Sequence, residues 1–191
     1  MASNDENVFT PEREPRLNPP HPWSRKHRLA RALWMLVGRP LFRVTFHTWH
    51  APRVAILRAF GAKIGPHTQI RPTARIEIPW HLTIDGDACI GDHAIIYNLG
   101  TIRIGRGSLI SQYAHLCAGT HDYTQRAFPL IRSPITIGTD VWVGADAFIG
   151  PGVTVGDRAV IGARASLYKD AEADKVYVGN PATPIKAREL R

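Results

Sequence analysis

The stretch from Ile137 to Leu167 reads IGTDVW VGADAF IGPGVT VGDRAV IGARAS L, with an aliphatic residue at every sixth position and a glycine after it in each hexad. A period of six fits neither the 3.6-residue repeat of an α-helix nor the two-residue repeat of a simple β-strand. It is typical of a parallel β-helix, in which each hexad forms a short strand and a turn and three hexads complete one coil. This stretch predicts the fold.

The same period extends upstream, with two places where the next aliphatic residue follows after only two positions. Its members there are Ile64, Ile70, Ile76, Leu82, Ile84, Ile90, Ile96, Ile102, Ile104, Ile110 and Leu116. We expect each to point into the prism and to stack on its equivalent eighteen residues on, about six coils in all. Glycine follows because the corner crowds any Cβ. A second inward position, four residues after the first, holds small or β-branched residues: Val141, Ala147, Val153, Ala159 and Ala165.

Residues 120–134 interrupt the period, which then resumes in register. An insertion that leaves the core untouched is expected to be a loop thrown outward, and such loops often carry function.

The rest of the chain divides around this body. Residues 1–22 are polar and rich in proline, which predicts a flexible tail. Residues 23–62 predict a basic helical segment, residues 63–170 the β-helix domain, and residues 171–191 a segment that closes it. The fold class expected is therefore mainly β.

Within the basic segment, Ser24 is a plausible N-cap for a helix that reaches Val37 and ends at Gly38-Arg39-Pro40. A second helix is expected from Pro52 to Phe60, closed by Gly61.

Composition narrows the class of protein. The net charge of the 191 residues is +8, and residues 1–62 hold ten Lys and Arg against four Asp and Glu. Two cysteines exclude a disulfide scaffold and a Cys-rich zinc module. No apolar run is long enough to span a bilayer and no secretory signal is visible, so a cytoplasmic location is expected. Nucleic acid is not an expected partner, because no recognition motif is present.

The basic segment leaves two readings open. It is favoured as a cap on the open end of the prism, which would otherwise expose strand edges and apolar interior. It could in addition make weak contact with an acidic membrane surface, at the inner face of the membrane.

Several motifs resemble the hexapeptide-repeat O-acetyltransferases of the colanic acid biosynthesis type, and more distantly the maltose, galactoside and nodulation-factor acetyltransferases. The resemblance covers roughly residues 25–188, and the loop around His121 is its most specific part. The motifs are Phe60–Gly65, Tyr97-Asn98-Leu99, Ile110-Ser111-Gln112, Leu116–Tyr123, Ala127–Leu130 and Gly179–Ala182. Membership implies a left-handed helix, a homotrimer, and acetyl-CoA bound in the groove between neighbouring prisms. It also implies acetyl transfer to a sugar hydroxyl, in exopolysaccharide or surface-glycan biosynthesis.

The resemblance assigns the acceptor side of the site. His121 matches the general base that removes a proton from the acceptor hydroxyl, a role suited to imidazole because it titrates near neutral pH. Asp122 either orients His121 or solvates the loop. Tyr123 shapes the acceptor pocket or packs the loop. Asn98, with Tyr97, matches an acceptor-contacting position, with a turn asparagine as the alternative.

The donor side is assigned in the same way. Trp142 is expected to line the thioester end, and the backbone near Ala145 to contact CoA and stabilise the oxyanion. Ala163, one coil later, is expected beside the pantetheine arm. Lys169 and Lys186 match basic residues near the charged end of CoA. No metal is required.

Other readings remain open. Cys117 could form an acyl-enzyme, and His93, His115 and His121 could bind metal across a subunit interface, as in γ-class carbonic anhydrases. An acyltransferase of this fold could also take an antibiotic or serine as its acceptor, and a scaffolding β-helix would bind no CoA. The residues fix neither the acceptor nor whether it is a hydroxyl or an amine.

Overall fold

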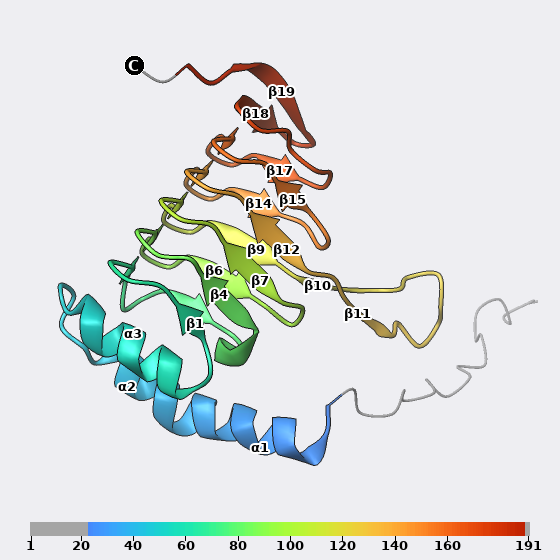
Figure 1. The fold of residues 1–191 in the computed structure, drawn as a ribbon. Helices are drawn as coiled ribbons and strands as arrows, with labels where there is room; N and C mark the ends of the chain where they lie inside the picture. Colours follow the sequence, from blue (N-terminus) through green and yellow to red (C-terminus); the bar gives the residue numbers. More distant parts are fainter. Residues whose placement is uncertain (1–22, 190–191) are drawn as a thin grey trace, which may run out of the picture.

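The structure is a computed structural model that describes residues 23–189, so the predicted tail of residues 1–22 lies outside the described residues. Its body is a prism of stacked parallel coils with short strands on three faces (Figure 1). The prediction of a mainly β chain that folds as a parallel β-helix is confirmed.

We name the three faces sheets A, B and C, in the order in which the chain visits them. Sheet A contains β1 (Lys63–Ile64), β4 (Leu82–Ile84), β7 (Ile102–Ile104), β12 (Ile135–Ile137) and β15 (Thr154–Val155). Sheet B contains β2 (Gln69–Ile70), β5 (Cys89–Ile90), β8 (Leu109–Ile110), β13 (Trp142–Val143), β16 (Val160–Ile161), β18 (Lys175–Gly179) and β19 (Ala182–Ala187). Sheet C contains β3 (Arg75–Ile76), β6 (Ile95–Tyr97), β9 (His115–Cys117), β14 (Phe148–Ile149) and β17 (Ser166–Leu167). Strand β19 runs antiparallel to β18 and closes the last coil.

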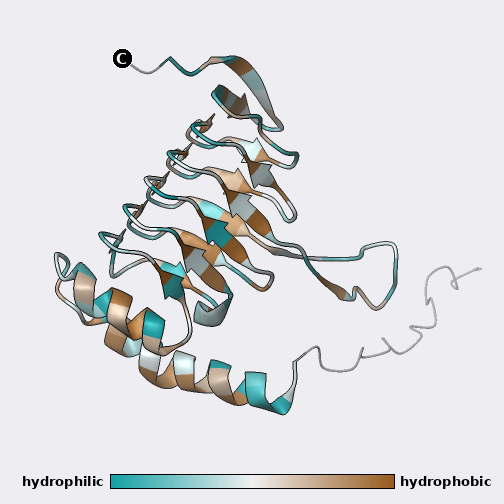
Figure 2. Ribbon diagram, viewed as in Figure 1, coloured by the Kyte–Doolittle hydropathy of each residue, from teal (hydrophilic) through white to brown (hydrophobic). Residues whose placement is uncertain are grey.

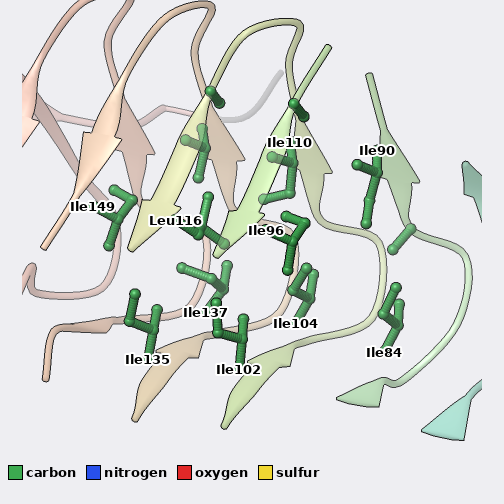
Figure 3. Close-up of a cluster of buried hydrophobic side chains, with 14 of the residues drawn as sticks. Ile84, Ile90, Ile96, Ile102, Ile104, Ile110, Leu116, Ile135, Ile137 and Ile149 are labelled. Atoms are coloured by element: carbon green, nitrogen blue, oxygen red, sulfur yellow. The ribbon is translucent and has the colours of Figure 1, made fainter. Parts of the chain in front are cut away.

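The core is a column of aliphatic side chains inside the prism (Figure 3). The residues of the six-residue period point inward and are buried, as are the small residues of the second inward position. Gly105 shows why glycine follows the aliphatic residue: a Cβ there would lie 2.3 Å from the carbonyl oxygen of Gly138 in the next coil. Both the inward pattern and the crowded corner are therefore confirmed.

The coil length differs from the prediction in the first half of the prism. The eighteen-residue step holds between β12 and β15, where Thr136 pairs with Thr154. Between β1 and β4 the step is twenty residues, since Lys63 pairs with Thr83. The difference arises where sheet C passes into sheet A, which we call the C–A corner. There the early coils take in two more residues, and Ile78 and Asn98 are fully buried.

Helices cover the N-terminal end of the prism (Figure 1). They are α1 (Arg25–Leu33), a π-helical turn η1 (Trp34–Gly38), α2 (Arg39–Arg43) and α3 (His50–Ala59); a short 3₁₀ turn, η2 (Pro79–His81), lies in the first coil. Ser24 caps α1 as expected, and its hydroxyl accepts a hydrogen bond from the His27 N–H. Gly61, with φ of +89°, follows α3 in the left-handed conformation that glycine favours.

The first helix does not end at Gly38, so that prediction is wrong. In the π-helical turn the N–H of Arg39 donates to the carbonyl of Trp34, five residues back. Pro40, which has no N–H to donate, stands directly after this turn, at the start of α2, where the missing donor is tolerated. The helical path therefore continues to Arg43, and Trp34 and Phe42 pack against the first coil.

Replacing Ile104 with alanine tests the stacked core. Ile104 is fully buried, so Ile104→Ala is expected to lower the free energy of unfolding by about 2–5 kcal/mol. Arg103→Ala, on the same strand but facing solvent, loses only an exposed ion pair with Asp85 and is expected to change stability by less than about 1 kcal/mol. Denaturant unfolding followed by circular dichroism measures both; equal losses would contradict the inward assignment.

Candidate functional site

The insertion forms a two-stranded hairpin that leaves the prism at the C–A corner (Figure 1). Its strands are β10 (Gly119–His121) and β11 (Leu130–Arg132), paired antiparallel with His121 opposite Leu130. The carbonyl of Ala118 accepts hydrogen bonds from the N–H of Gly100 at 3.0 Å and of Ser133 at 3.3 Å. The chain thus leaves and re-enters the coil at one place, and the predicted outward loop is confirmed.

The base of the hairpin is fixed to the start of the helical cap. Leu130 packs against a small cluster that includes Trp23, Ile78 and Leu99. The guanidinium carbon of Arg132 lies 4.3 Å from the centre of the Trp23 ring, a cation–π contact. Sequence reasoning missed Trp23, because a single aromatic residue beside a proline-rich segment has no periodicity that would reveal its partner.

His121 stands exposed on β10 with a fixed tautomer. Its Nδ1 lies 2.6 Å from the carbonyl oxygen of Phe128 across the hairpin. A carbonyl can only accept, so Nδ1 carries the proton and Nε2 of the neutral ring keeps a free lone pair. This arrangement leaves Nε2 able to take a proton from a hydroxyl placed against it. A backbone carbonyl has no sequence signature, so no pattern could have identified this partner.

Asp122 braces the loop instead of orienting His121. Its carboxylate accepts from the Thr124 hydroxyl at 2.6 Å, the Thr124 N–H at 3.0 Å and the Gln125 amide at 2.8 Å. These bonds, the Thr124 hydroxyl first, hold the pKa of Asp122 below its usual range. Beside it, Tyr123 projects into solvent with 84% of its side chain exposed. Of the two roles open to Asp122, the geometry favours the loop.

Asn98 is not at the surface of the chain. It is fully buried, its amide N–H donates to the Ile78 carbonyl at 2.6 Å, and its amide oxygen accepts from the Ile78 N–H at 2.9 Å. At the C–A corner the two additional residues of the early coils interrupt the backbone hydrogen bonds between successive coils. The Asn98 side chain supplies hydrogen bonds in their place. Both the oxygen and the nitrogen of its amide are thus engaged by the Ile78 backbone inside the corner. Tyr97 is half-buried and packs with the cluster beneath the hairpin.

Four of the five predicted donor residues, all but Lys169, gather on another side of the prism. On sheet B, Trp142, Val160, Val176 and Lys186 stand opposite one another on four neighbouring strands. Strands lie about 4.8 Å apart, so this row is about 14 Å long. It lines a hollow of about 700 Å³. The Trp142 ring is half-exposed, and its N–H donates to the Ser111 hydroxyl at 3.0 Å. We call this the sheet B row.

Ala145 and Ala163 lie beside the row, where sheet B passes into sheet C. They occupy the same place in successive coils, and the carbonyl of Ala145 accepts from the N–H of Arg164 at 2.9 Å. The N–H groups of the two alanines themselves find no acceptor within residues 23–189. The backbone N–H of Gln112, at the same place one coil earlier, also has no acceptor within residues 23–189. An N–H without an acceptor is therefore a feature of this corner in three successive coils.

The two groups of predicted residues do not meet within one chain. Lys169 stands exposed at the C–A corner, two coils beyond the hairpin, on the side of His121. The sheet B row lies on a different face. One chain therefore holds the predicted site residues in two separate places, one around His121 and one around Trp142.

The histidines considered for metal binding are also apart. His93 stacks on Tyr113, and His115 packs edge-on against Phe148 on sheet C. Burial, with Arg75 nearby, lowers the pKa of His115. Within the described part of the chain no three His, Cys, Asp or Glu side chains gather as a metal site would need. Cys117 is half-buried, and its thiol donates to the Gly119 carbonyl.

Among residues 23–189, no helix is long and apolar enough to cross a membrane.

Known proteins similar to this chain share both its sequence and its fold. Residues 134–169 match the family model described as bacterial transferase hexapeptide (six repeats). A protein of Escherichia coli (strain K12), named as a colanic acid biosynthesis acetyltransferase, is 43% identical over 156 residues, which cover 82% of this chain and 86% of that protein.

Two solved structures have the same fold. A maltose O-acetyltransferase from Clostridium difficile 630 superposes with a TM-score of 0.76 at 26% identity, covering 87% of this chain and 90% of that one. A hexapeptide-repeat-containing acetyltransferase from Vibrio cholerae O1 biovar eltor, complexed with acetyl coenzyme A, gives a TM-score of 0.70 at 25% identity, covering 87% and 91%. With its coils, its hairpin and these relatives, the chain belongs to the hexapeptide-repeat acetyltransferase family, whose left-handed parallel β-helix it shares, and it is an acyltransferase.

Proposed function

We propose that this acetyltransferase transfers the acetyl group of acetyl-CoA to a hydroxyl of a sugar, in the synthesis of an exopolysaccharide or another surface glycan. The observation that carries the proposal is the state of His121 on the exposed hairpin: Nδ1 is hydrogen-bonded to the Phe128 carbonyl, and Nε2 has no partner within residues 23–189. The name of the 43% identical relative supports a glycan acceptor, and the acetyl-CoA complex among the structural neighbours supports the donor.

The reaction needs one general base and one group that stabilises the oxyanion of the tetrahedral intermediate. Nε2 of His121 takes the proton of the acceptor hydroxyl while its oxygen attacks the thioester carbonyl. The tetrahedral intermediate carries its charge on the former carbonyl oxygen, which the free N–H of Ala145 stabilises. When the intermediate collapses, the C–S bond breaks, CoA leaves as a thiolate, and the proton on His121 passes to its sulfur. The products are the acetyl ester and the CoA thiol.

The sheet B row suits the shape of acetyl-CoA. Acetyl-CoA has a thin pantetheine arm that ends in phosphates. The arm would lie along Trp142, Val160 and Val176, and the phosphates would reach the cationic Lys186. The N–H groups of Ala145 and Ala163, which have no acceptor within residues 23–189, can donate to the amide carbonyls of the pantetheine arm. The side chain of Lys186 makes no hydrogen bond or ion pair within residues 23–189, so its charge is available to a phosphate.

The separation of the residues around His121 from those around Trp142 supports a homotrimer. In a cyclic trimer the C–A corner of one chain can face sheet B of the next, which brings His121 and Lys169 of one subunit to Trp142 and Lys186 of its neighbour. Three such contacts close the ring and complete three sites. Under this arrangement Tyr123, at the tip of the hairpin, lies beside the acceptor, whereas Asn98 supports the corner from within.

Replacing His121 tests the base. His121→Ala is expected to lower kcat for CoA thiol release, with simple glycosides as acceptors, by about 10²- to 10⁴-fold, because the attacking hydroxyl loses its proton acceptor. The dissociation constant for acetyl-CoA should stay the same, because His121 is not part of the row. A thiol-trapping assay and calorimetric titration measure the two quantities.

Asp122→Asn serves as the control on the same loop. Its hydrogen bonds join Thr124 and Gln125, so kcat should fall less than about tenfold. A fall as large as that of His121→Ala would show that Asp122 acts on the base. If the unaltered protein binds no acetyl-CoA at millimolar concentration, the proposed donor is wrong.

Changing the row tests the donor site. Lys186→Gln and Trp142→Ala are each expected to weaken acetyl-CoA binding by about 5- to 20-fold, through loss of a phosphate contact and of apolar packing. Lys63→Gln, an exposed lysine on sheet A, changes the net charge equally and should leave affinity unchanged. Calorimetry compares them, and an equal loss in Lys63→Gln would point to a general charge effect instead of a site.

Mixing two impaired variants tests the shared site, provided that acetyl-CoA is kept well below its dissociation constant so that sites with Trp142→Ala contribute little. When His121→Ala and Trp142→Ala chains form random mixed trimers, about a quarter of the sites combine an intact hairpin with an intact row. Activity should therefore recover to about a quarter of the unaltered protein after co-refolding at equal amounts. No recovery, with mixed trimers demonstrated by native mass spectrometry, would mean that each chain completes its own site.

A further inference from the structure

The helical cap exposes an unusual amount of apolar surface. Large side chains on successive turns from α1 to just past α2 point into solvent and lie on one side of the helix, by their spacing of three or four residues. We call them the outer stripe: Leu29, Leu33, Leu36, Val37, Leu41 and Val44. Leu29, Leu36 and Val44 are 74%, 77% and 78% exposed. Figure 2 shows apolar residues along the cap.

The fold does not need the outer stripe. The opposite side of the same helical path carries Trp34, Gly38 and Phe42, which are buried against the prism. The Trp34 N–H donates to the Ile76 carbonyl at 3.0 Å and fixes the helix on the first coil. The cap is therefore apolar on both sides. Residues 23–189 cover only the side that carries Trp34, Gly38 and Phe42, and they leave the outer stripe exposed.

The charged residues around the outer stripe are all positive. Arg25, Lys26, Arg28, Arg39 and Arg43 lie on α1 and α2, and none of them forms an ion pair with any described residue. The sequence contains no Asp or Glu between Glu14 and Glu77. Leucines beside unpaired cations form the pattern of helices that lie in the headgroup region of a bilayer.

We propose that the outer stripe docks the protein on an anionic lipid surface. The leucines enter the acyl boundary while the cations meet the headgroups. Phe46 and Trp49, which follow α2 and are 62% and 59% exposed, add the aromatic side chains that favour a membrane interface. A nucleic acid would satisfy the cations but leave the leucines in water. This inference does not rest on the proposed acceptor.

Docking at this end suits the position of the hairpin. The helices lie at one end of the prism and β19 at the other (Figure 1). The hairpin leaves from the third coil, two strand spacings or about 10 Å from the first. If the enzyme docks through its cap, the long axis of the prism points away from the membrane. His121 is then held above the lipid surface.

Flotation with lipid vesicles tests the proposal. The full chain is mixed with vesicles of phosphatidylcholine alone, or with about one-third phosphatidylglycerol, at 50 and 500 mM NaCl. Binding is expected only to the anionic vesicles, and it should weaken at high salt because exposed charges are screened. A protein that stays with the soluble fraction in every case overturns the proposal.

Two double variants separate the contributions. Leu29→Gln with Leu36→Gln should weaken binding to anionic vesicles by at least tenfold, because two leucines no longer leave water. Arg28→Gln with Arg43→Gln should weaken it by about 30-fold, at roughly fivefold per cation near the surface. Arg103→Gln with Arg106→Gln, which removes the same charge from the A side of the prism, should change it less than threefold.

Each variant needs a check that it folds, and all replaced side chains are exposed. Circular dichroism and lipid-free CoA release should match the unaltered protein. Analytical ultracentrifugation without lipid gives the alternative outcome. If the leucine variant changes the oligomeric state and no variant changes flotation, the stripe joins two copies of the chain and the lipid proposal is wrong. Unchanged flotation of the leucine variant alone also overturns it.

Discussion

Hydrogen bonds between successive coils hold this protein together, and they require every coil to present the same width to the next. An aliphatic residue at each sixth position fills the interior, and glycine at the crowded corner lets the backbones approach. Once the coils are in register, side chains on the outside are aligned as well. The row from Trp142 to Val176 exists because three parallel strands repeat the same placement, and the antiparallel strand β19 adds Lys186 opposite Val176. The candidate donor site is thus a by-product of the repeat that makes the core.

Periodicity could predict the prism but not its irregularities. The inward positions and the crowded glycines follow from a spacing of six that can be read from Ile137 to Leu167 alone, and the outward insertion follows from the break in that spacing at residues 120–134. The early coils take in two more residues at one corner, and Asn98 compensates there for lost backbone hydrogen bonds. A turn asparagine and a buried one look alike in sequence, because the difference lies in which backbone groups the fold leaves unpaired. The prediction that the first helix ends at Pro40 failed for a related reason. A π-helical turn precedes Pro40, so the helix continues although proline has no N–H to donate.

The sequence could propose a set of residues for the candidate site but not their arrangement. Spacing and family resemblance pointed to His121, Trp142, Ala145 and Lys186, yet they could not tell that one chain keeps the hairpin and the row on different faces. The state of His121 also depends on the hairpin, since the Phe128 carbonyl selects the tautomer only after residues seven apart face each other across two strands. Side-chain chemistry can be read from the sequence, whereas backbone partners and the placement of residues on separate faces need the fold.

The single exit point of the hairpin has a consequence for how such proteins diversify. Gly100 and Ser133 both donate to the Ala118 carbonyl, so the core is continuous whether fourteen residues intervene or fewer. Insertions, deletions and recombination within this segment do not disturb the stacking on either side. Evolution can therefore exchange the part that meets one substrate while the part aligned along sheet B is inherited unchanged. A laboratory can follow the same route by transplanting hairpins between relatives that share this corner.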